Sequence, residues 1–169
     1  QSVNSWWAHT LSCSYYDVRR KYRDEKDDID ITEDKQSWYK GDNKKFEWQH
    51  NFSPVNWDTL STGFEYEEAR GSAYDRSGAS IKKVDRKAID NKGYYLQNQL
   101  KFWEKLFITP GLRVDDHELF GTETTYKIST AYLIPQTSAR LKANWGTGFK
   151  APSLYQLYST EDYGGGPIG

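Results

Sequence analysis

Four aspartates lie close together in one stretch of the chain, where they could bind a metal ion: Asp27, Asp28, Asp30 and Asp34. Clustered carboxylates suit Ca²⁺, which takes roughly six to eight oxygen ligands. Their spacing does not match an EF-hand loop, and interspersed Lys and Arg residues offset the negative charge. The stretch is therefore expected to be a solvated, charged loop, with a weak calcium site as the alternative.

The three histidines lie in separate segments and do not form a catalytic group. His117 follows Asp115 and Asp116, which resembles a metal-binding cluster, but one aspartate ends a predicted strand and the other opens a loop. His9 and His50 fall on the apolar side of predicted strands, so we expect structural roles for them. No catalytic constellation is evident, and the sequence predicts a protein that is not an enzyme and needs no metal or cofactor.

The composition narrows the class of protein further. The 23 basic and 24 acidic residues give a net charge of −1, which gives no reason to expect nucleic-acid binding. Cys13 is the single cysteine, so an intrachain disulfide and a Cys-based zinc site are excluded. Aromatic residues make up 16% of an otherwise polar chain, and Trp and Tyr favour membrane interfaces. No apolar run is long enough for a transmembrane helix, so a membrane protein of this sequence would have to be a β-barrel.

The elements that position these residues are predicted to be β-strands, because apolar and polar residues alternate with a period of two. One face of each strand is apolar and often aromatic, while the other carries charges and amides. We expect seven strands, at 7–15, 45–52, 57–67, 94–102, 108–115, 126–132 and 139–145.

The connections between these strands alternate in length. Short connections are predicted at 53–56, 103–105 and 135–137, and long ones at about 19–37, 69–92 and 116–124, with a further one after Lys150. This alternation, with aromatic residues near the strand ends, is typical of outer-membrane barrels. A soluble antiparallel sheet with one wet face would give the same periodicity and remains an alternative.

Two segments near the end of the chain carry a specific resemblance. Residues 111–121 read GLRVDDHELFG, and residues 146–158 read GTGFKAPSLYQLY. Both are similar to sequences of TonB-dependent outer-membrane receptors, in which the second motif ends a strand and enters an outer loop. The positions that match the family are Gly111, Arg113, Asp115, Gly121, Gly146, Gly148, Phe149, Lys150, Ala151 and Pro152.

The resemblance implies an all-β fold: an antiparallel up-and-down meander of about seven strands, part of a transmembrane β-barrel that has 22 strands in the family. Residues 1–169 would form one partial barrel domain, without the plug domain and without the closing strands. Within the family the chain is most similar to cobalamin and siderophore receptors. The expected location is the outer membrane of a Gram-negative bacterium.

The implied function is uptake of a scarce nutrient, a ferric siderophore or a corrinoid, energised by the TonB complex through the absent plug. Outer-membrane lipid would be the other partner. Aromatic residues of the outer loops are the expected ligand contacts: Tyr22, Trp38, Tyr39, Tyr74, Phe120, Tyr155 and Tyr158. Two alternatives remain, a soluble aromatic-rich module of the carbohydrate-binding kind and a passive porin.

Overall fold

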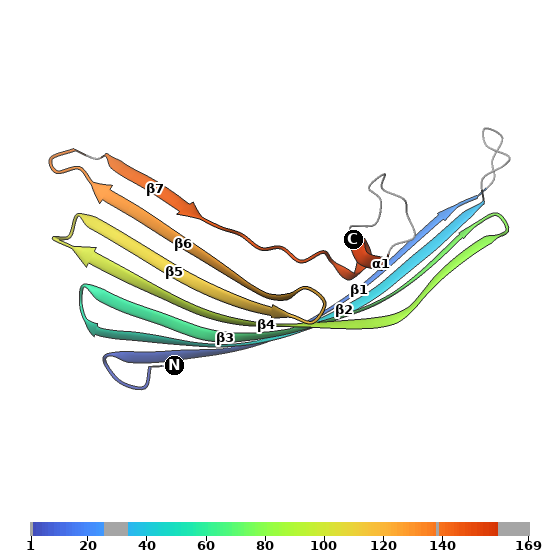
Figure 1. The fold of residues 1–169 in the computed structure, drawn as a ribbon, viewed down its shortest axis with the longest axis horizontal. Coiled ribbons are helices and arrows are strands. Elements are labelled where there is room, and N and C mark those ends of the chain that lie inside the picture. The colour runs from blue at the N-terminus through green and yellow to red at the C-terminus, as the bar shows by residue number, and fades with distance from the viewer. Residues whose placement is uncertain (1, 26–33, 138, 159–169) are drawn as a thin grey trace. The chain divides into compact units, whose positions relative to one another are not determined.

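The computed structural model describes residues 2–25, 34–137 and 139–158 of the chain. These residues form seven β-strands and one short helix (Figure 1). The strands are β1 (Trp7–Asp24), β2 (Lys35–Val55), β3 (Asp58–Ser77), β4 (Ser80–Phe102), β5 (Leu106–His117), β6 (Gly121–Leu133) and β7 (Arg140–Gly146), and the helix is α1 (Leu154–Tyr158).

The seven strands form one sheet in the order β1-β2-β3-β4-β5-β6-β7. Each strand therefore pairs with its neighbours in sequence, and the pairs β4–β5, β5–β6 and β6–β7 are antiparallel throughout. The predicted all-β antiparallel meander is confirmed.

The register of β4 to β7 confirms the predicted separation of faces. Leu96 pairs with Leu112, which pairs with Tyr126, and Ile128 pairs with Trp145. Because paired residues point to the same side of a sheet, these apolar residues share one face. On the opposite face Tyr95 pairs with Arg113, and Gly111 pairs with Lys127.

Two predicted long connections are wrong in extent. β3 continues to Ser77 and β4 begins at Ser80, so most of the predicted connection 69–92 is strand. The predicted connection 116–124 shrinks to residues 118–120 between β5 and β6. Ladder hydrogen bonds continue where both faces of a strand are polar, so the apolar alternation ends before the strand does.

The other predicted connections change in a similar way. β1 extends to Asp24 and β2 begins at Lys35, which shortens the predicted connection 19–37 from both sides. After Lys150 the chain forms the short helix α1, where a connection was predicted. Ser153 and Gln156 cap its first turn, since the Gln156 N–H donates to Ser153 Oγ at 3.2 Å and the Ser153 N–H donates to Gln156 Oε1 at 2.9 Å.

The turn between β4 and β5 has a left-handed backbone at two bulky residues. Trp103 has φ 47° and Glu104 has φ 58°, and the Lys105 N–H donates to the Phe102 carbonyl at 3.0 Å. Two successive positive φ angles are the pattern of a type I′ turn, whose twist matches that of the flanking strands. Glycine supplies the positive φ in the β3–β4 and β5–β6 turns, at Gly78 and Gly121, whereas Gln136 has φ 63° in the β6–β7 turn.

The chain divides into two compact units. Unit 1 comprises Gln1–Cys13, Lys45–Glu67 and Asp90–Ala151, and unit 2 comprises Ser14–Lys44, Glu68–Ile89 and Pro152–Gly169. Among the described residues the only apolar side chains that count as buried are Ile89 and Leu154, both in unit 2.

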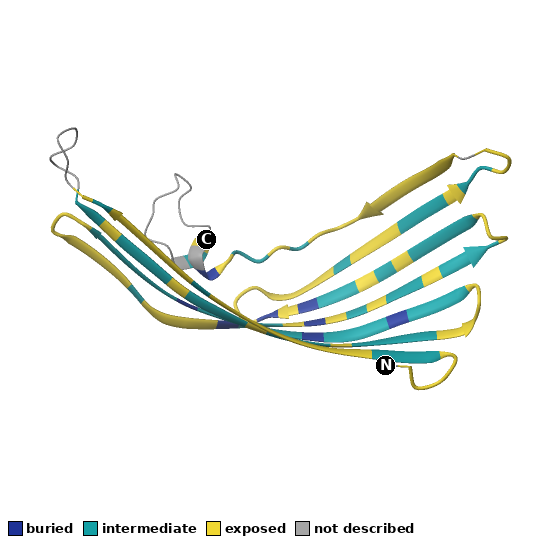
Figure 2. Cartoon of the chain, turned by 180° about the vertical axis from the view of Figure 1, so that it is seen from behind, coloured by how far each residue is buried: buried dark blue, intermediate teal, exposed yellow. Residues whose placement is uncertain are grey.

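The described part of unit 1 therefore has no apolar core, although its strands carry many large apolar side chains. Figure 2 shows that most of the strand residues are intermediate or exposed. No helix among the described residues is long and apolar enough to cross a membrane.

Candidate functional site

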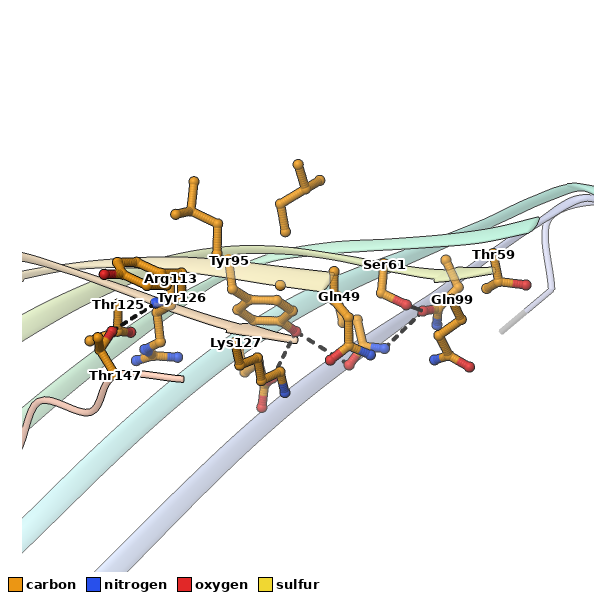
Figure 3. A pocket seen from close by; sticks show the side chains of 16 residues that line it. Gln49, Thr59, Ser61, Tyr95, Gln99, Arg113, Thr125, Tyr126, Lys127 and Thr147 are labelled. Carbon is orange, nitrogen blue, oxygen red and sulfur yellow. Dashed lines mark hydrogen bonds between the residues drawn. The ribbon is translucent and has the colours of Figure 1, made fainter. Parts of the chain in front are cut away.

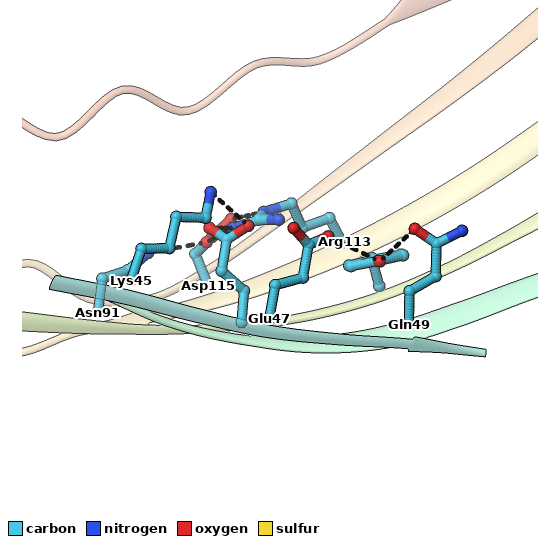
Figure 4. A network of polar contacts seen from close by, with 8 residues as sticks. Lys45, Glu47, Gln49, Asn91, Arg113 and Asp115 are labelled. Carbon is cyan, nitrogen blue, oxygen red and sulfur yellow. Dashed lines mark hydrogen bonds and ion pairs between the residues drawn. The ribbon is translucent and has the colours of Figure 1, made fainter. Parts of the chain in front are cut away.

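An ion-pair network covers the polar face of unit 1 on four neighbouring strands (Figure 4). Arg113 on β5 donates from Nη2 to Asp115 Oδ1 at 2.7 Å and to Glu65 Oε1 on β3 at 3.0 Å. Lys45 on β2 lies 2.8 Å from Glu65 Oε2, and Asn91 on β4 donates to Asp115 Oδ1 at 3.1 Å. Glu65 and Asp115 are only 8% and 6% exposed. Each buried carboxylate thus has a cationic partner and a second donor.

Tyr95 crosses the same face toward β2. Its hydroxyl lies 3.0 Å from Glu47 Oε1 and 3.3 Å from Gln49 Oε1. The ring lies over Gly63 on β3, where the position of an added Cβ would be 2.5 Å from the tyrosine hydroxyl oxygen. Only a glycine at this position leaves space for the ring, so Gly63 permits the contact between β4 and β2.

Arg113 and Lys127 also lie over glycines. The Arg113 Cζ is 2.9 Å from where a Cβ of Gly93 would be. Lys127 lies over Gly111, with its Cε at 3.1 Å from the corresponding position. Three long side chains of β4, β5 and β6 therefore lie across a glycine of the preceding strand.

The polar face of unit 1, formed by β2 to β6, is called the polar wall below. A hollow of about 500 Å³ lies along it (Figure 3). On the polar face its lining combines charged, amide and hydroxyl groups with one aromatic ring, and Leu96, Leu112 and Tyr126 also contribute to the lining. The groups on the polar face include Glu47, Gln49, Asn51, Ser61, Tyr95, Gln97, Gln99, Arg113, Thr125 and Lys127. Ser61 donates to Asn51 at 2.6 Å, which fixes the amide at one end. The hollow can hold water or a polar group, and it contains no nucleophile paired with a base.

The apolar face of unit 1 carries an aromatic cluster on β1 and β2. The Trp7 indole N–H donates to His50 Nδ1 at 3.2 Å, and the Trp48 indole N–H donates to His9 Nδ1 at 3.3 Å. The two imidazole rings stack with centroids 6.2 Å apart. Both histidines thus accept a tryptophan hydrogen bond, the kind of contact that a structural role requires.

In unit 2, two aromatic residues stack across β2 and β3. The Trp38 and Tyr74 ring centroids are 5.8 Å apart with an interplanar angle of 8°. The Lys40 ammonium lies 5.3 Å from the Trp38 ring centroid, in a cation–π contact.

Tyr39 follows Trp38 in the strand and therefore points to the opposite side. It lies over Gly41 and Gly71, and Leu154 of α1 also lies against Gly71. Burial, and secondarily the Asp42 carboxylate, raises the pKa of Tyr39, so its phenol is protonated at neutral pH. A protonated hydroxyl and a partly covered ring thus lie on this side of unit 2.

The family model described as "TonB dependent receptor-like, beta-barrel" matches residues 2–169. The chain belongs to the TonB-dependent receptor family. The vitamin B12 transporter BtuB of Photobacterium profundum is 30% identical over 111 residues, which are 66% of this chain and 17% of that protein. The ferric enterobactin receptor PirA of Pseudomonas aeruginosa is 30% identical over 88 residues, 52% of this chain and 10% of that protein.

A solved structure shows the same fold. The siderophore receptor PirA from Pseudomonas aeruginosa superposes with a TM-score of 0.55 and 16% identity, over 88% of this chain and 30% of that chain. The receptor chain described here therefore spans a minor part of the length of the relatives that it matches. The family resemblance predicted from the two motifs is confirmed.

The motif residues of this TonB-dependent receptor take part in the wall to different degrees. Arg113 and Asp115 belong to the ion-pair network. Gly111 and Gly146 both pair with Lys127 in the register, and Gly121 turns the chain between β5 and β6. Gly148, Phe149, Lys150, Ala151 and Pro152 follow β7 and make none of these contacts.

The predicted ligand residues of the receptor belong to both units, Phe120 to unit 1 and the other six to unit 2. Trp38 and Tyr74 come together, whereas Tyr39 lies on the other side of its strand. Tyr22 is exposed and its hydroxyl donates to Asp24 at 2.9 Å. Phe120 contacts the ring of His117 in unit 1 at 5.0 Å. Tyr155 and Tyr158 belong to α1, and their side chains lie outside the described residues.

The metal candidates are separated or occupied. Asp27, Asp28 and Asp30 lie outside the described residues, and Asp34 forms an ion pair with Arg76 at 3.0 Å. No group of three His, Cys, Asp or Glu side chains that could hold a metal ion occurs in the described part of the chain.

The arrangement around His117 also departs from a metal cluster. Asp115 is engaged by Arg113, whereas Asp116 accepts a hydrogen bond from Thr122 at 3.3 Å. The two aspartates are adjacent in a strand and therefore point to opposite faces. His117 is buried, and its Nδ1 accepts the Leu119 N–H at 3.2 Å.

Sequence reasoning missed Tyr95 as a residue of the polar face. The available signal was parity, because Tyr95 falls among the polar positions of its strand, together with Gln97 and Gln99. The glycine beneath its ring gave no signal, because the crossing depends on the register between strands.

Proposed function

We propose that the chain is part of the barrel of an outer-membrane transporter that takes up a scarce nutrient in a Gram-negative bacterium. The match to the TonB-dependent receptor barrel family over residues 2–169 carries this proposal. Relatives bear the names vitamin B12 transporter and ferric enterobactin receptor. Corrinoids and ferric siderophores are therefore the two ligand classes that we propose.

The difference between the two faces of unit 1 supports the proposal that its strands form part of a membrane-spanning barrel. Large apolar side chains such as Leu96, Leu112 and Trp145 are exposed on one face, where lipid would cover them. The ion-pair network and the polar hollow lie on the other face, which suits a water-filled interior. A strand that spans the bilayer needs roughly 9–11 residues. We propose that the strands of unit 1 cross the membrane and that unit 2 belongs to the water-exposed part.

We propose that transport is energised through the TonB complex, by way of a plug that enters the barrel. The ligand would pass without any change in its covalent bonds, so no residue of this chain is assigned a catalytic role. Membership of the TonB-dependent receptor family argues against a soluble carbohydrate-binding module. A requirement for TonB separates active uptake from a passive porin.

The ligand contacts proposed first are those with a defined geometry in unit 2. Trp38 and Tyr74 offer a stacked pair beside the Lys40 ammonium, and Tyr39 lies on the opposite side of β2, with its ring over Gly71. Because the two sides of β2 face in opposite directions, a bound ligand would contact only one of them directly. Tyr22, Phe120, Tyr155 and Tyr158 remain proposed contacts on the strength of residue type and loop position.

Uptake by the intact receptor tests the proposal. The gene would be expressed in a strain without its own cobalamin and ferric enterobactin receptors, with and without functional TonB. We expect TonB-dependent uptake of labelled cyanocobalamin or ferric enterobactin. Absence of both, or equal uptake without TonB, would contradict the proposal.

Variants in unit 2 test the ligand contacts separately. Trp38→Ala and Tyr39→Ala remove groups from opposite sides of β2, so only one of them should weaken ligand binding by about ten-fold, or ~1.4 kcal/mol. Trp57→Ala, in a short turn of unit 1, is the control and should bind like the parent receptor. If all three variants bind the ligand as tightly as the parent receptor, neither side of β2 contacts the ligand.

A further inference from the structure

One amide interrupts the apolar face of unit 1 at the centre of β4. Five successive alternate positions of β4 point to this face, and Asn98 is the third of them. The other four are aromatic or aliphatic and pair with apolar residues of β5: Tyr94 with Val114, Leu96 with Leu112, Leu100 with Ile108 and Phe102 with Leu106. Asn98 therefore lies roughly 13 Å along the strand from either end of this apolar series.

No hydrogen-bond partner for this amide exists within the described residues. The Asn98 side-chain oxygen is buried and accepts no hydrogen bond, and the side-chain nitrogen donates none to a described residue. The pairing of β4 with β5 stops at Gln97 and resumes at Leu100, so Asn98 lies opposite Pro110. Proline has no N–H, so the adjacent residue of β5 cannot donate a backbone hydrogen bond to the amide.

The amide lies at the surface of the sheet, where a second molecule can reach it. Asn98 as a whole is half-buried, and the side-chain torsion of an asparagine amide is soft. Rotation about this torsion brings either the oxygen or the nitrogen to the surface. The partner that one chain lacks can therefore be supplied from outside.

Water does not satisfy this amide in the place that we propose for unit 1. The hydrocarbon layer of a bilayer contains no water that could bond to a polar group, and acyl chains offer neither a donor nor an acceptor. A polar side chain in this layer is costly, and such residues commonly hydrogen-bond to another membrane segment. This requirement rests on the proposed function, which places the apolar face in lipid.

A second copy of the chain supplies both groups that the amide lacks. An asparagine side chain has one acceptor oxygen and an NH₂ donor group. Two such amides related by a two-fold axis donate to each other, so the position is self-complementary, as a symmetric dimer requires. Leu96 and Leu112, each 46% exposed, flank the amide and would pack around the pair. We propose that the apolar face of β4 and β5 is an interface between two receptor molecules in the membrane, joined through Asn98.

Self-association of the intact receptor in phosphatidylcholine vesicles tests the proposal. Energy transfer between donor-labelled and acceptor-labelled receptors reports dimers as the protein-to-lipid ratio rises. Asn98→Leu should weaken association by about ten-fold, or ~1.4 kcal/mol, because the reciprocal hydrogen bonds are lost. Asn98→Gln keeps the amide and should associate more tightly than Asn98→Leu. Gln99→Leu, the matched control, removes an amide from the opposite face of β4 and should associate like the parent receptor.

Urea unfolding distinguishes an interface from an internal structural role. In the monomer, Asn98→Leu replaces an unpartnered polar group by an apolar one, so the variant should be at least as stable as the parent. A less stable monomer would show that the amide already has a partner within the chain, and it would overturn the proposal.

Disulfide cross-linking tests which part of the sheet meets the second copy. In a Cys13→Ser background, Asn98→Cys should form a covalent dimer on oxidation, because a two-fold axis brings the two copies of the residue together. Leu141→Cys, 63% exposed on β7 of the same face, should remain monomeric. A cross-link to a different polypeptide in outer membranes, or equal association of Asn98→Leu and the parent, would overturn the proposal. TonB-dependent uptake by the parent receptor is measured in parallel, so failure of the interface is distinguished from failure of the proposed function.

Discussion

The two faces of unit 1 differ in how their side chains are satisfied. On the apolar face, Leu96 and Leu112 are directly paired and each is 46% exposed, so neither has an apolar partner that covers it. On the polar face, Glu65 and Asp115 are buried by neighbouring side chains that reach across glycines. The apolar face therefore depends on the solvent that covers it, whereas the polar face is organised by contacts within the sheet.

The largest effect should come from a charge on the apolar face. Leu96→Arg would place a cation in lipid and reduce the free energy of unfolding by roughly 2–4 kcal/mol. Gln99→Arg lies on the polar face of the same strand and should change it much less. Urea unfolding of the intact receptor in a bilayer measures both, and equal losses would contradict the assignment of the faces.

Removal of the central cation of the polar face should come next. Arg113→Met leaves Asp115 with Asn91 and Glu65 with Lys45, so the loss should be about 2–3 kcal/mol, near the lower limit for a broken buried pair. Lys127→Met removes the same charge from the same face without breaking an ion pair. The same unfolding measurement should show little change for this control. A loss as large as that of Arg113→Met would mean that the network is not what stabilises the wall.

Glycine substitutions should have a smaller effect that depends on the neighbouring atom. A Cβ at Gly146 meets the Tyr126 carbonyl oxygen at 2.7 Å, and a backbone atom cannot move aside easily. Gly146→Ala should therefore lower the free energy of unfolding by about 1–3 kcal/mol, as overpacking does. Gly148→Ala has nothing within 4 Å and should be neutral. If the two variants unfold at the same urea concentration, the close approach at Gly146 is not strained.

The smallest effect should be the loss of one hydroxyl group. Tyr95→Phe keeps the ring over Gly63 and removes the hydrogen bonds to Glu47 and Gln49, for a loss of about 1 kcal/mol. Tyr126→Phe, on the apolar face, is the control. No change for Tyr95→Phe would show that the ring alone maintains the contact between β4 and β2.

Period-two alternation was sufficient to predict the seven strands and their faces. The sets containing Leu96 and Arg113 fell on opposite sides because the alternation is a local property of a strand. The same signal failed for residues 69–92, where the large apolar residues Ile81, Val84 and Ile89 do not alternate regularly and the strands extend without an apolar stripe. The length of these strands is set by hydrogen bonding to the adjacent strand. The alternation of residues along a single strand carries no information about that pairing.

The candidate site was predicted only in part, for a related reason. Arg113 and Asp115 were identified through a motif that runs along one strand. Arg113 and its partner Glu65 are 48 residues apart in the sequence. Tyr95 and Gly63, which it crosses, lie on different strands. Only the register between strands brings the members of each pair together. The tryptophan–histidine hydrogen bonds between β1 and β2 were likewise out of reach of single-strand patterns.

The glycine crossings have a consequence for how related sequences can vary. Each crossing couples two positions, because a side chain larger than hydrogen at Gly63 or Gly93 displaces Tyr95 or Arg113. Substitutions at the paired positions should therefore appear together across homologues. A relative that gains a side chain at the glycine should also shorten its crossing residue. Such covariation would join positions on neighbouring strands, and it would give the strand register of a distant relative from its sequences alone.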